Sequence, residues 1–212
     1  MRVSIAVLSL TLLCGAALAS VVAVGPGVFP ATPVLTFTGL ADGTEVNGLI
    51  VSGVQFSYSL GNGNIVIDGG PGTTNNVIPQ NVVSIGNPAG VLTLLLPSQS
   101  NIFGYGYAIL NTITVPNATT ITLFLGATNQ GSLSYTGVVD PVFTGGFAGI
   151  QSTLPFDRVQ LTFNSAAAPA FAVDNIRFAN VVIPEPSTWL LTLGAVALVF
   201  VGLRRKPSAR QS

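Results

Sequence analysis

The stretch "RVQLTFNSAAAPAFAVDNIRF" (residues 158–178) carries two short runs with the period of a β-strand. In the first run, Val159, Leu161 and Phe163 alternate with polar or charged residues. Successive side chains of a strand point to opposite faces, so this run predicts a strand with one buried and one solvent-exposed face. Such one-sided strands are typical of antiparallel sheets.

The second run, "FAVDNIRF" (171–178), contains a carboxylate that the pattern predicts to be buried. Strict alternation places Asp174 on one face together with Ala172, Ile176 and Phe178. A buried carboxylate needs a hydrogen-bond donor, an opposite charge or a metal ion. Asp174 is therefore a candidate site residue.

Similar runs recur throughout residues 20–182, separated by Gly, Asn and Pro, with very little helical period. They predict strands at residues 33–38, 46–52, 54–60, 65–68, 82–85, 91–96, 104–110, 119–126, 132–138, 142–149, 158–164 and 171–178. Many short strands at this spacing predict one all-β domain, an antiparallel β-sandwich or jelly roll.

Two hairpin turns are predicted within this domain. In "SYSLGNGNIVI" (57–67), Asn62-Gly63 stands between alternating segments, and this dipeptide tolerates the positive φ of a tight turn. In "TITLFLGATNQGSLSY" (120–135), the residues 129–131 are expected to do the same.

Charge is distributed unevenly along the chain. The domain holds two arginines, Arg158 and Arg177, against six carboxylates, a net charge of −4, and it has no Lys. Binding to a polyanion such as nucleic acid depends on cations that neutralise phosphates. The composition therefore excludes nucleic acid as an expected partner of the domain.

The first 19 residues have the features of a secretory signal peptide. One Arg precedes an apolar stretch, and Ala17 and Ala19 form an A-x-A site with cleavage expected before Ser20. The alternatives are a retained anchor helix and lipoprotein processing at Cys14. Removal of residues 1–19 leaves a chain without cysteine, which excludes disulfides and thiolate metal sites.

The other end predicts a membrane segment. Residues 187–203 carry no charge, and 18 residues ending at Leu203 make roughly 27 Å of helix, close to the roughly 30 Å of a bilayer core. The basic cluster Arg204, Arg205 and Lys206 is expected to stop translocation and to begin a cytoplasmic tail, residues 204–212. The alternative is an apolar core helix with a polar tail.

Pro184, Glu185 and Pro186 precede this segment, and the two prolines keep the backbone extended. The tail 183–208 resembles the PEP-CTERM sorting signal of Gram-negative bacteria. The resemblance implies export through the inner membrane, recognition of the triplet by an exosortase, and a place in the cell envelope, on the cell surface or in an extracellular matrix. It also implies an association with exopolysaccharide and biofilm. The three residues would be substrate residues of the exosortase.

A looser resemblance concerns the domain itself. Residues 149–180 are similar to the closing hairpin of β-sandwich domains that PEP-CTERM proteins often carry, and residues 35–58 resemble their opening strands. The resemblance implies the same sandwich fold.

Candidate catalytic and metal residues are few, because the chain has no His and the domain no Cys or Lys. A Ser or Thr nucleophile would lack its usual base. Two carboxylate pairs suit a glycan hydrolase, Asp42 with Asp174 and Asp140 with Asp157. We expect no catalytic residue, no metal and no cofactor.

Calcium is the metal that carboxylates favour, and Asp42, Glu45 and Asp174 are its candidate ligands. In the preferred alternative, Asp174 accepts backbone N–H groups or pairs with Arg158 or Arg177, and Asp42 caps its own turn.

Sugar rings stack on aromatic side chains, and the candidates in the domain are Tyr58, Tyr105, Tyr107 and Tyr135. Tyr105 and Tyr107 share one face of a strand and are a candidate platform; the alternative is that they belong to the core. Taken together, the sequence predicts an exported, non-enzymatic envelope or matrix protein. The alternatives are a carbohydrate-binding module for the exopolysaccharide and a carboxylate-dependent glycan hydrolase.

Overall fold

The computed structural model describes residues 19–29, 33–69 and 74–181. Within these ranges the chain forms a ten-stranded antiparallel sheet and one 3-10 turn, and no α-helix. The elements are β1 (Val21–Ala23), η1 (Pro26–Val28), β2 (Ile50–Val51), β3 (Val54–Tyr58), β4 (Ile65–Asp68), β5 (Asn81–Ser84), β6 (Leu92–Ile109), β7 (Val115–Leu125), β8 (Thr128–Val139), β9 (Thr144–Phe163) and β10 (Phe171–Ala179). The predicted antiparallel all-β class is confirmed.

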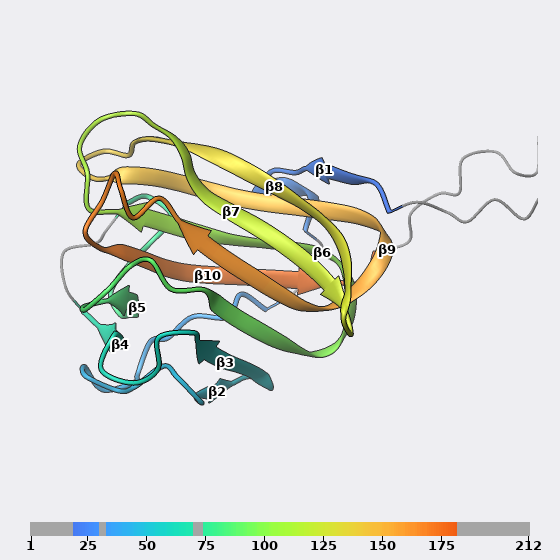
Figure 1. Ribbon diagram of the computed structural model, residues 1–212, viewed down its shortest axis with the longest axis horizontal. Coiled ribbons are helices and arrows are strands. Elements are labelled where there is room, and N and C mark those ends of the chain that lie inside the picture. Colours follow the sequence, from blue (N-terminus) through green and yellow to red (C-terminus); the bar gives the residue numbers. More distant parts are fainter. Residues whose placement is uncertain (1–18, 30–32, 70–73, 182–212) are drawn as a thin grey trace, which may run out of the picture. The chain divides into compact units, whose positions relative to one another are not determined.

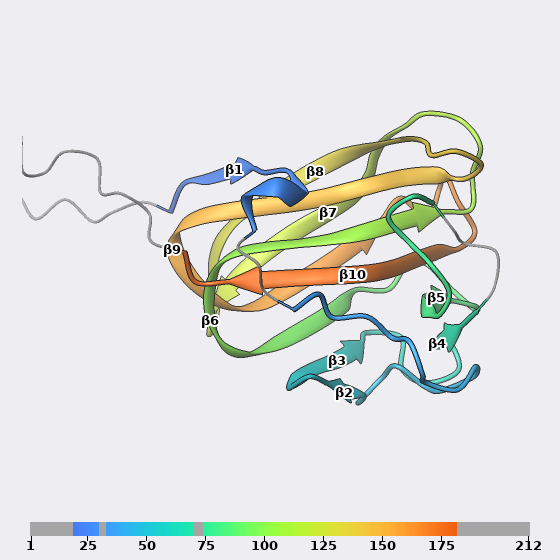
Figure 2. The ribbon, with the colours of Figure 1, turned by 180° about the vertical axis from the view of Figure 1, so that it is seen from behind.

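Two long strands, β6 and β9, divide the sheet into two halves that face each other (Figures 1 and 2). In the β10 half, residues 102–109 of β6 pair with β10 and with residues 144–151 of β9, and β5 and β4 follow beyond β10. In the β7 half, residues 92–95 of β6 pair with β3 and with residues 158–161 of β9, followed by β7 and β8. Register shifts near Ser100 mark the point where β6 changes halves.

Because β6 and β9 each run through both halves of the sheet, several predicted strands were too short. The predicted strands 91–96 and 104–110 are one strand, β6, and the predicted strands 142–149 and 158–164 are both parts of β9. The predicted strand 33–38 is wrong, because within the described residues only an isolated bridge from Leu35 to Ile176 forms there.

One predicted hairpin is wrong and one is shifted. The segments around Asn62-Gly63 do not pair with each other, since β3 pairs with β2 and β6 while β4 pairs with β5. β7 and β8 do form a hairpin, but its tight turn lies at Gly126-Ala127 and residues 129–131 form an irregularity within β8. Gly126 has φ +56°, the left-handed conformation that favours glycine.

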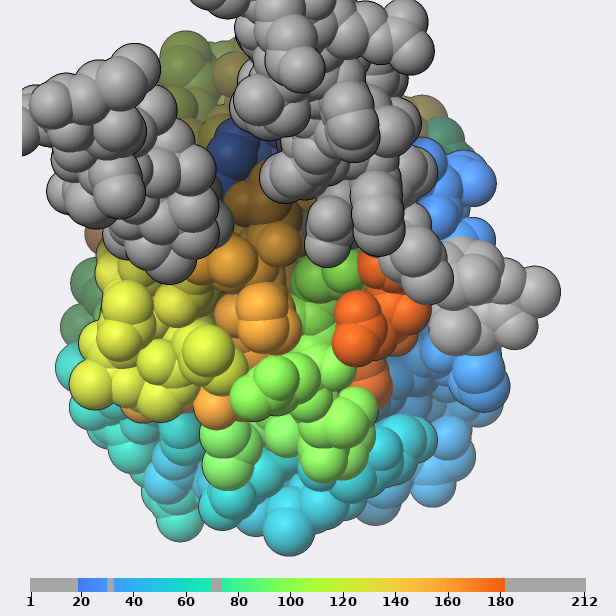
Figure 3. Space-filling view, turned by 90° about the vertical axis from the view of Figure 1, so that its right-hand side faces the viewer, coloured from blue at the N-terminus to red at the C-terminus, as the bar shows by residue number. Residues whose placement is uncertain are grey.

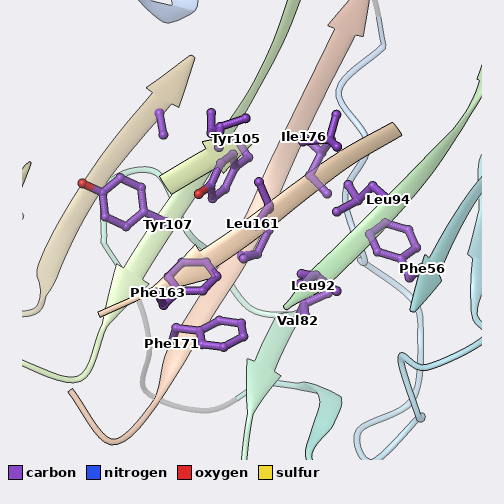
Figure 4. Close-up of a cluster of buried hydrophobic side chains, with 14 of the residues drawn as sticks. Phe56, Val82, Leu92, Leu94, Tyr105, Tyr107, Leu161, Phe163, Phe171 and Ile176 are labelled. Atoms are coloured by element: carbon purple, nitrogen blue, oxygen red, sulfur yellow. The ribbon is translucent and has the colours of Figure 1, made fainter. Parts of the chain in front are cut away.

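The two halves enclose one apolar core, shown in Figure 4. Phe163 of the β7 half and Phe171 of the β10 half stack with ring centroids 3.8 Å apart. Tyr105 meets Phe163 edge-on at 6.5 Å. The alternation in 158–164 is confirmed, because Val159, Leu161 and Phe163 all lie in this core.

The end of the domain seen in Figure 3 joins segments that are distant in sequence. Asn101 of β6 donates from Nδ2 to the carbonyl of Val181 at 2.5 Å and accepts the N–H of Val181 at 2.7 Å. Residues 182–212, and with them the predicted transmembrane helix 187–203, lie outside the described residues. Among the residues described, no helix has the length and hydropathy of a membrane span.

Candidate functional site

A β-bulge in β10 decides where Asp174 lies. The register of β10 against β6 shifts between Asp174 and Arg177, and Asn175 has φ +52°. The bulge adds one residue to the alternation, so Ile176 lies in the core with Val173 whereas Asp174 points to the opposite, outer face. The prediction that Asp174 and Ile176 share a face is therefore wrong. The predicted burial of Asp174 is confirmed, with 0% of the side chain exposed.

The outer face at Asp174 is covered by residues 74–81. The Asp174 Oδ2 accepts the N–H of Ile78 at 3.2 Å, whereas its Oδ1 has no hydrogen-bond partner. β10 and β5 are antiparallel, and Val173 pairs with Val82. The same register, continued by one residue, places Asn81 opposite Asp174. Asn81 donates to the carbonyl of Ile78 at 3.0 Å, and its own Oδ1 also lacks a donor.

Burial raises the pKa of Asp174 from 3.8 to about 6, because a desolvated carboxylate is less favourable than a neutral carboxyl group. The N–H groups of Asn175 and Ile78 act in the opposite direction and lower the pKa. The alternative in which Asp174 accepts backbone N–H groups is thus confirmed.

The three candidate calcium ligands bind different groups. Asp42 accepts the N–H of Gly69 at 3.0 Å, and Glu45 accepts the N–H of Gly63 with both oxygens, at 3.0 and 3.1 Å. Residues 19–29, 33–69 and 74–181 contain no group of three or more His, Cys, Asp or Glu side chains placed to hold a metal ion. The structure does not bring the predicted set Asp42, Glu45 and Asp174 together.

The predicted carboxylate pair Asp140 and Asp157 is also separated. Asp140 lies at the end of β8 and accepts from the side-chain amides of Asn75 and Asn76, the latter at 3.1 Å. Asp157 accepts the N–H of Gly126 at 3.1 Å, at the start of β8. The length of a twelve-residue strand separates them, about 40 Å when fully extended, too far for the two carboxyl groups of a glycosidase.

The predicted sugar platform of Tyr105 and Tyr107 is wrong, because both side chains lie in the core with at most 1% exposed (Figure 4). The hydroxyl of Tyr105 shares a hydrogen bond with that of Thr119. Burial raises the pKa of Tyr107 to about 12 and that of Tyr105 well above its usual value. The alternative that these tyrosines belong to the core is confirmed.

Tyr58 and Tyr135 are not free for stacking either. Tyr58 is 3% exposed and donates to the carbonyl of Asn87 at 2.5 Å. The half-buried Tyr135 donates to the carbonyl of Gly149 at 2.6 Å. All four tyrosines therefore serve the fold.

A surface that the sequence analysis missed lies on the outer side of the β7 half. In-register pairing across β3, β6, β9, β7 and β8 aligns two rows of side chains, which we call the polar face. The first row consists of Ser57, Thr93, Gln160, Thr122 and Ser132. The second row, beside the first, consists of Gln55, Leu95, Arg158, Phe124 and Asn129. The alternation in 158–164 indicated the outward direction of Arg158 and Gln160, but not their neighbours.

A hollow of about 170 Å³ lies at the opposite half, beside β5, β6 and β10. Its lining is apolar and includes Val83, Ala108, Phe171 and Ala172. These side chains offer no hydrogen bond or charge to a ligand.

The processing residues lie at the borders of the described ranges. Ser20 is described: its N–H donates to the Thr153 hydroxyl at 3.0 Å, and its carbonyl accepts the N–H of Thr153 at 3.0 Å. β1 begins at the next residue and pairs with β9. The other predicted processing residues lie outside the described ranges: Ala17, Pro184, Glu185, Pro186, Arg204, Arg205 and Lys206.

Several solved structures have a similar β architecture at low identity. A mutant of the carbohydrate-binding module CBM29-2 is 10% identical, with a TM-score of 0.39 over 79% of this chain and 99% of its own. The catalytic domain of a GH87 α-1,3-glucanase in complex with tetrasaccharides is 11% identical, with a TM-score of 0.42 over 74% of this chain and 31% of its own. TM-scores this low give no information about the site.

No curated protein matches the sequence. The terminal segment matches the PEP-CTERM protein-sorting motif over residues 182–206. This match includes Pro184, Glu185 and Pro186 and the basic cluster that begins at Arg204. The chain carries a PEP-CTERM protein-sorting motif at its C-terminal end.

Proposed function

We propose that this chain is an exported, non-enzymatic protein of the cell envelope or of the exopolysaccharide matrix of a Gram-negative bacterium. The observation that supports the proposal most directly is the sorting motif at residues 182–206. A signal peptide at 1–19 starts export, and the helix 187–203 with Arg204, Arg205 and Lys206 holds the tail in the inner membrane. An exosortase then recognises the Pro184-Glu185-Pro186 triplet.

In this proposal the domain 20–182 is a β-sandwich of the jelly-roll type. It is the part of the protein that is exported, and it catalyses no reaction. Its carboxylates are bound separately to backbone and amide groups, which supports a role without acid–base chemistry. The start of β1 at Val21, directly after the expected cleavage before Ser20, suits a mature chain that begins within its own sheet. Carbohydrate binding by the domain is the alternative, followed by glycan hydrolysis.

The triplet can be tested by replacing Pro184, Glu185 and Pro186 together with alanine in the producing cells. We expect the parent protein to lose its tail and to end near residues 184–186, because an extended, helix-incompatible segment is accessible to a processing enzyme. The triple variant should instead stay in the membrane fraction and end at Ser212. Intact-mass measurement of the medium and membrane fractions checks both termini.

The matched control is Ser187→Ala, which changes the neighbouring residue and leaves the triplet intact. It should be processed like the parent protein. A parent protein that ends at Ser212 in cells with an active exosortase would contradict the proposal, as would a triple variant that is still shortened.

A further inference from the structure

We propose that the polar face binds an acidic polysaccharide, with Arg158 pairing with a carboxylate of a uronic sugar. This inference specifies the ligand of the carbohydrate-binding alternative. It rests on the proposed export, because export is what brings the domain to such a polymer. Three features of the face carry it: its rows of short polar side chains, its single cation, and its small apolar content.

The first feature is a continuous row of hydrogen-bonding groups. Ser57 pairs with Thr93, Thr93 with Gln160, Gln160 with Thr122 and Thr122 with Ser132, so five strands present one polar side chain each. At about 4.8 Å between strands the row is about 19 Å long. Hydroxyl and amide groups both donate and accept, as the hydroxyls of a sugar do. An extended chain of sugars along this row would find a partner at every strand.

The second feature is Arg158 in the neighbouring row. Its guanidinium carbon lies 4.6 Å from the centroid of the Phe124 ring, a cation–π contact with its neighbour in the row. Its Nε is buried, as is that of Arg177, so a ligand on the face would reach the two terminal nitrogens of Arg158. The two terminal nitrogens of a guanidinium can donate two parallel hydrogen bonds to one carboxylate. Arg158 is the one charged member of the two rows, and the neighbouring carboxylate of Asp157 accepts the N–H of Gly126 at the β7–β8 turn.

The third feature argues against other partners. Among the members of the two rows, only Leu95, 46% exposed, and Phe124 are large apolar side chains, whereas a stable protein interface has a well-packed apolar or aromatic centre. A nucleic acid would need several cations to replace its counterions, and the face has one. A polymer with many hydroxyl groups and scattered carboxylates fits the face better.

The test measures binding of the protein purified from its producing cells to glucuronoxylan, a neutral sugar chain with scattered uronic side groups, and to the same polymer after reduction of its carboxyl groups. We expect binding to the acidic polymer, at least tenfold weaker binding to the reduced polymer, and a decrease with added salt. Arg158→Gln should weaken binding to the acidic polymer at least tenfold, and Thr122→Val should weaken binding to both polymers.

Arg177→Gln is the matched control. Arg177 is the other arginine of the domain, and it lies in the β10 half, 5.9 Å from the Phe147 ring centroid. This variant should bind like the parent protein, and thermal melting should show that all three variants are folded. The proposal is overturned if the parent protein binds neither polymer or both equally, or if Arg158→Gln binds like the parent. Such a result would leave the sorting proposal intact, since the latter is decided by the masses of the termini.

Discussion

Replacing Gly106 by alanine is expected to destabilise the domain by about 3 kcal/mol or more. A Cβ at this position would overlap the carbonyl oxygen of Asn76, which lies directly on the outer face of β6. The obstacle is backbone, so no change of rotamer relieves it. The Asn76 carbonyl also accepts from the side chain of Asn175 at 2.8 Å, and the covering segment is held further by Asp174 through Ile78. The added methyl group would therefore push out a whole covering segment and expose its buried polar groups.

Urea denaturation of the parent protein and the variant measures this effect. Gly27→Ala is the matched control, because a Cβ there meets nothing within 4 Å and the backbone is not in the left-handed region. The control should change the free energy of unfolding by less than about 0.5 kcal/mol. A Gly106→Ala variant as stable as this control would show that residues 74–81 do not cover the sheet tightly.

Replacing Asp174 by asparagine is expected to stabilise the domain at neutral pH and to flatten its pH dependence. The folded protein holds a proton on Asp174 more tightly than the unfolded chain does, because its pKa rises from 3.8 to about 6. The stability that this proton contributes is complete below about pH 4 and is lost as the pH rises from about 4 to about 6. Above that window a charged carboxylate is buried with one oxygen unpartnered, at a cost of about 2 to 3 kcal/mol. Asparagine has nearly the same shape and carries no charge.

The two proteins should therefore have similar free energies of unfolding at pH 4 and differ by about 2 to 3 kcal/mol at pH 7. Denaturation of both across pH 4–8 measures the difference directly. Asp157→Asn serves as the control, since its carboxylate lies at the hairpin turn and accepts only the N–H of Gly126. An Asp174→Asn variant that is less stable than the parent protein at pH 7 would show that the charged form is the one that the fold requires.

Both variants act on the same covering segment, which shows how the outer side of the β10 half is closed. Gly106 lets the backbone of Asn76 approach, and Asp174 and Asn81 hold Ile78 from two sides. Among the described residues no such segment covers the polar face, whose members Gln55, Ser57 and Ser132 are exposed. The proposed polysaccharide site lies on this face.

Local patterns determined a large part of this protein. The alternation in 158–164 predicted which side chains enter the core, the recurrence of short alternating runs predicted the all-β class, and the terminal segment from Pro184 to Lys206 predicted the sorting motif. Each of these is a property of a short stretch of chain, independent of what packs against it. A period of two along a strand is enough to separate its inner from its outer face.

Tertiary structure decided what depends on pairing between distant strands. The bulge at Asn175 moved Ile176 to the core and left Asp174 on the outer face, because one extra residue inverts every later side chain of a strand. The pattern in 104–110 did not show which face of β6 would meet the other half, and so it did not predict that Tyr105 lies in the core. The polar face arises from the registers of five strands, β3, β6, β9, β7 and β8. Some neighbours in this order, such as β3 and β6, are far apart in the sequence. Those registers are set by the packing of the whole core, which no single stretch of sequence contains.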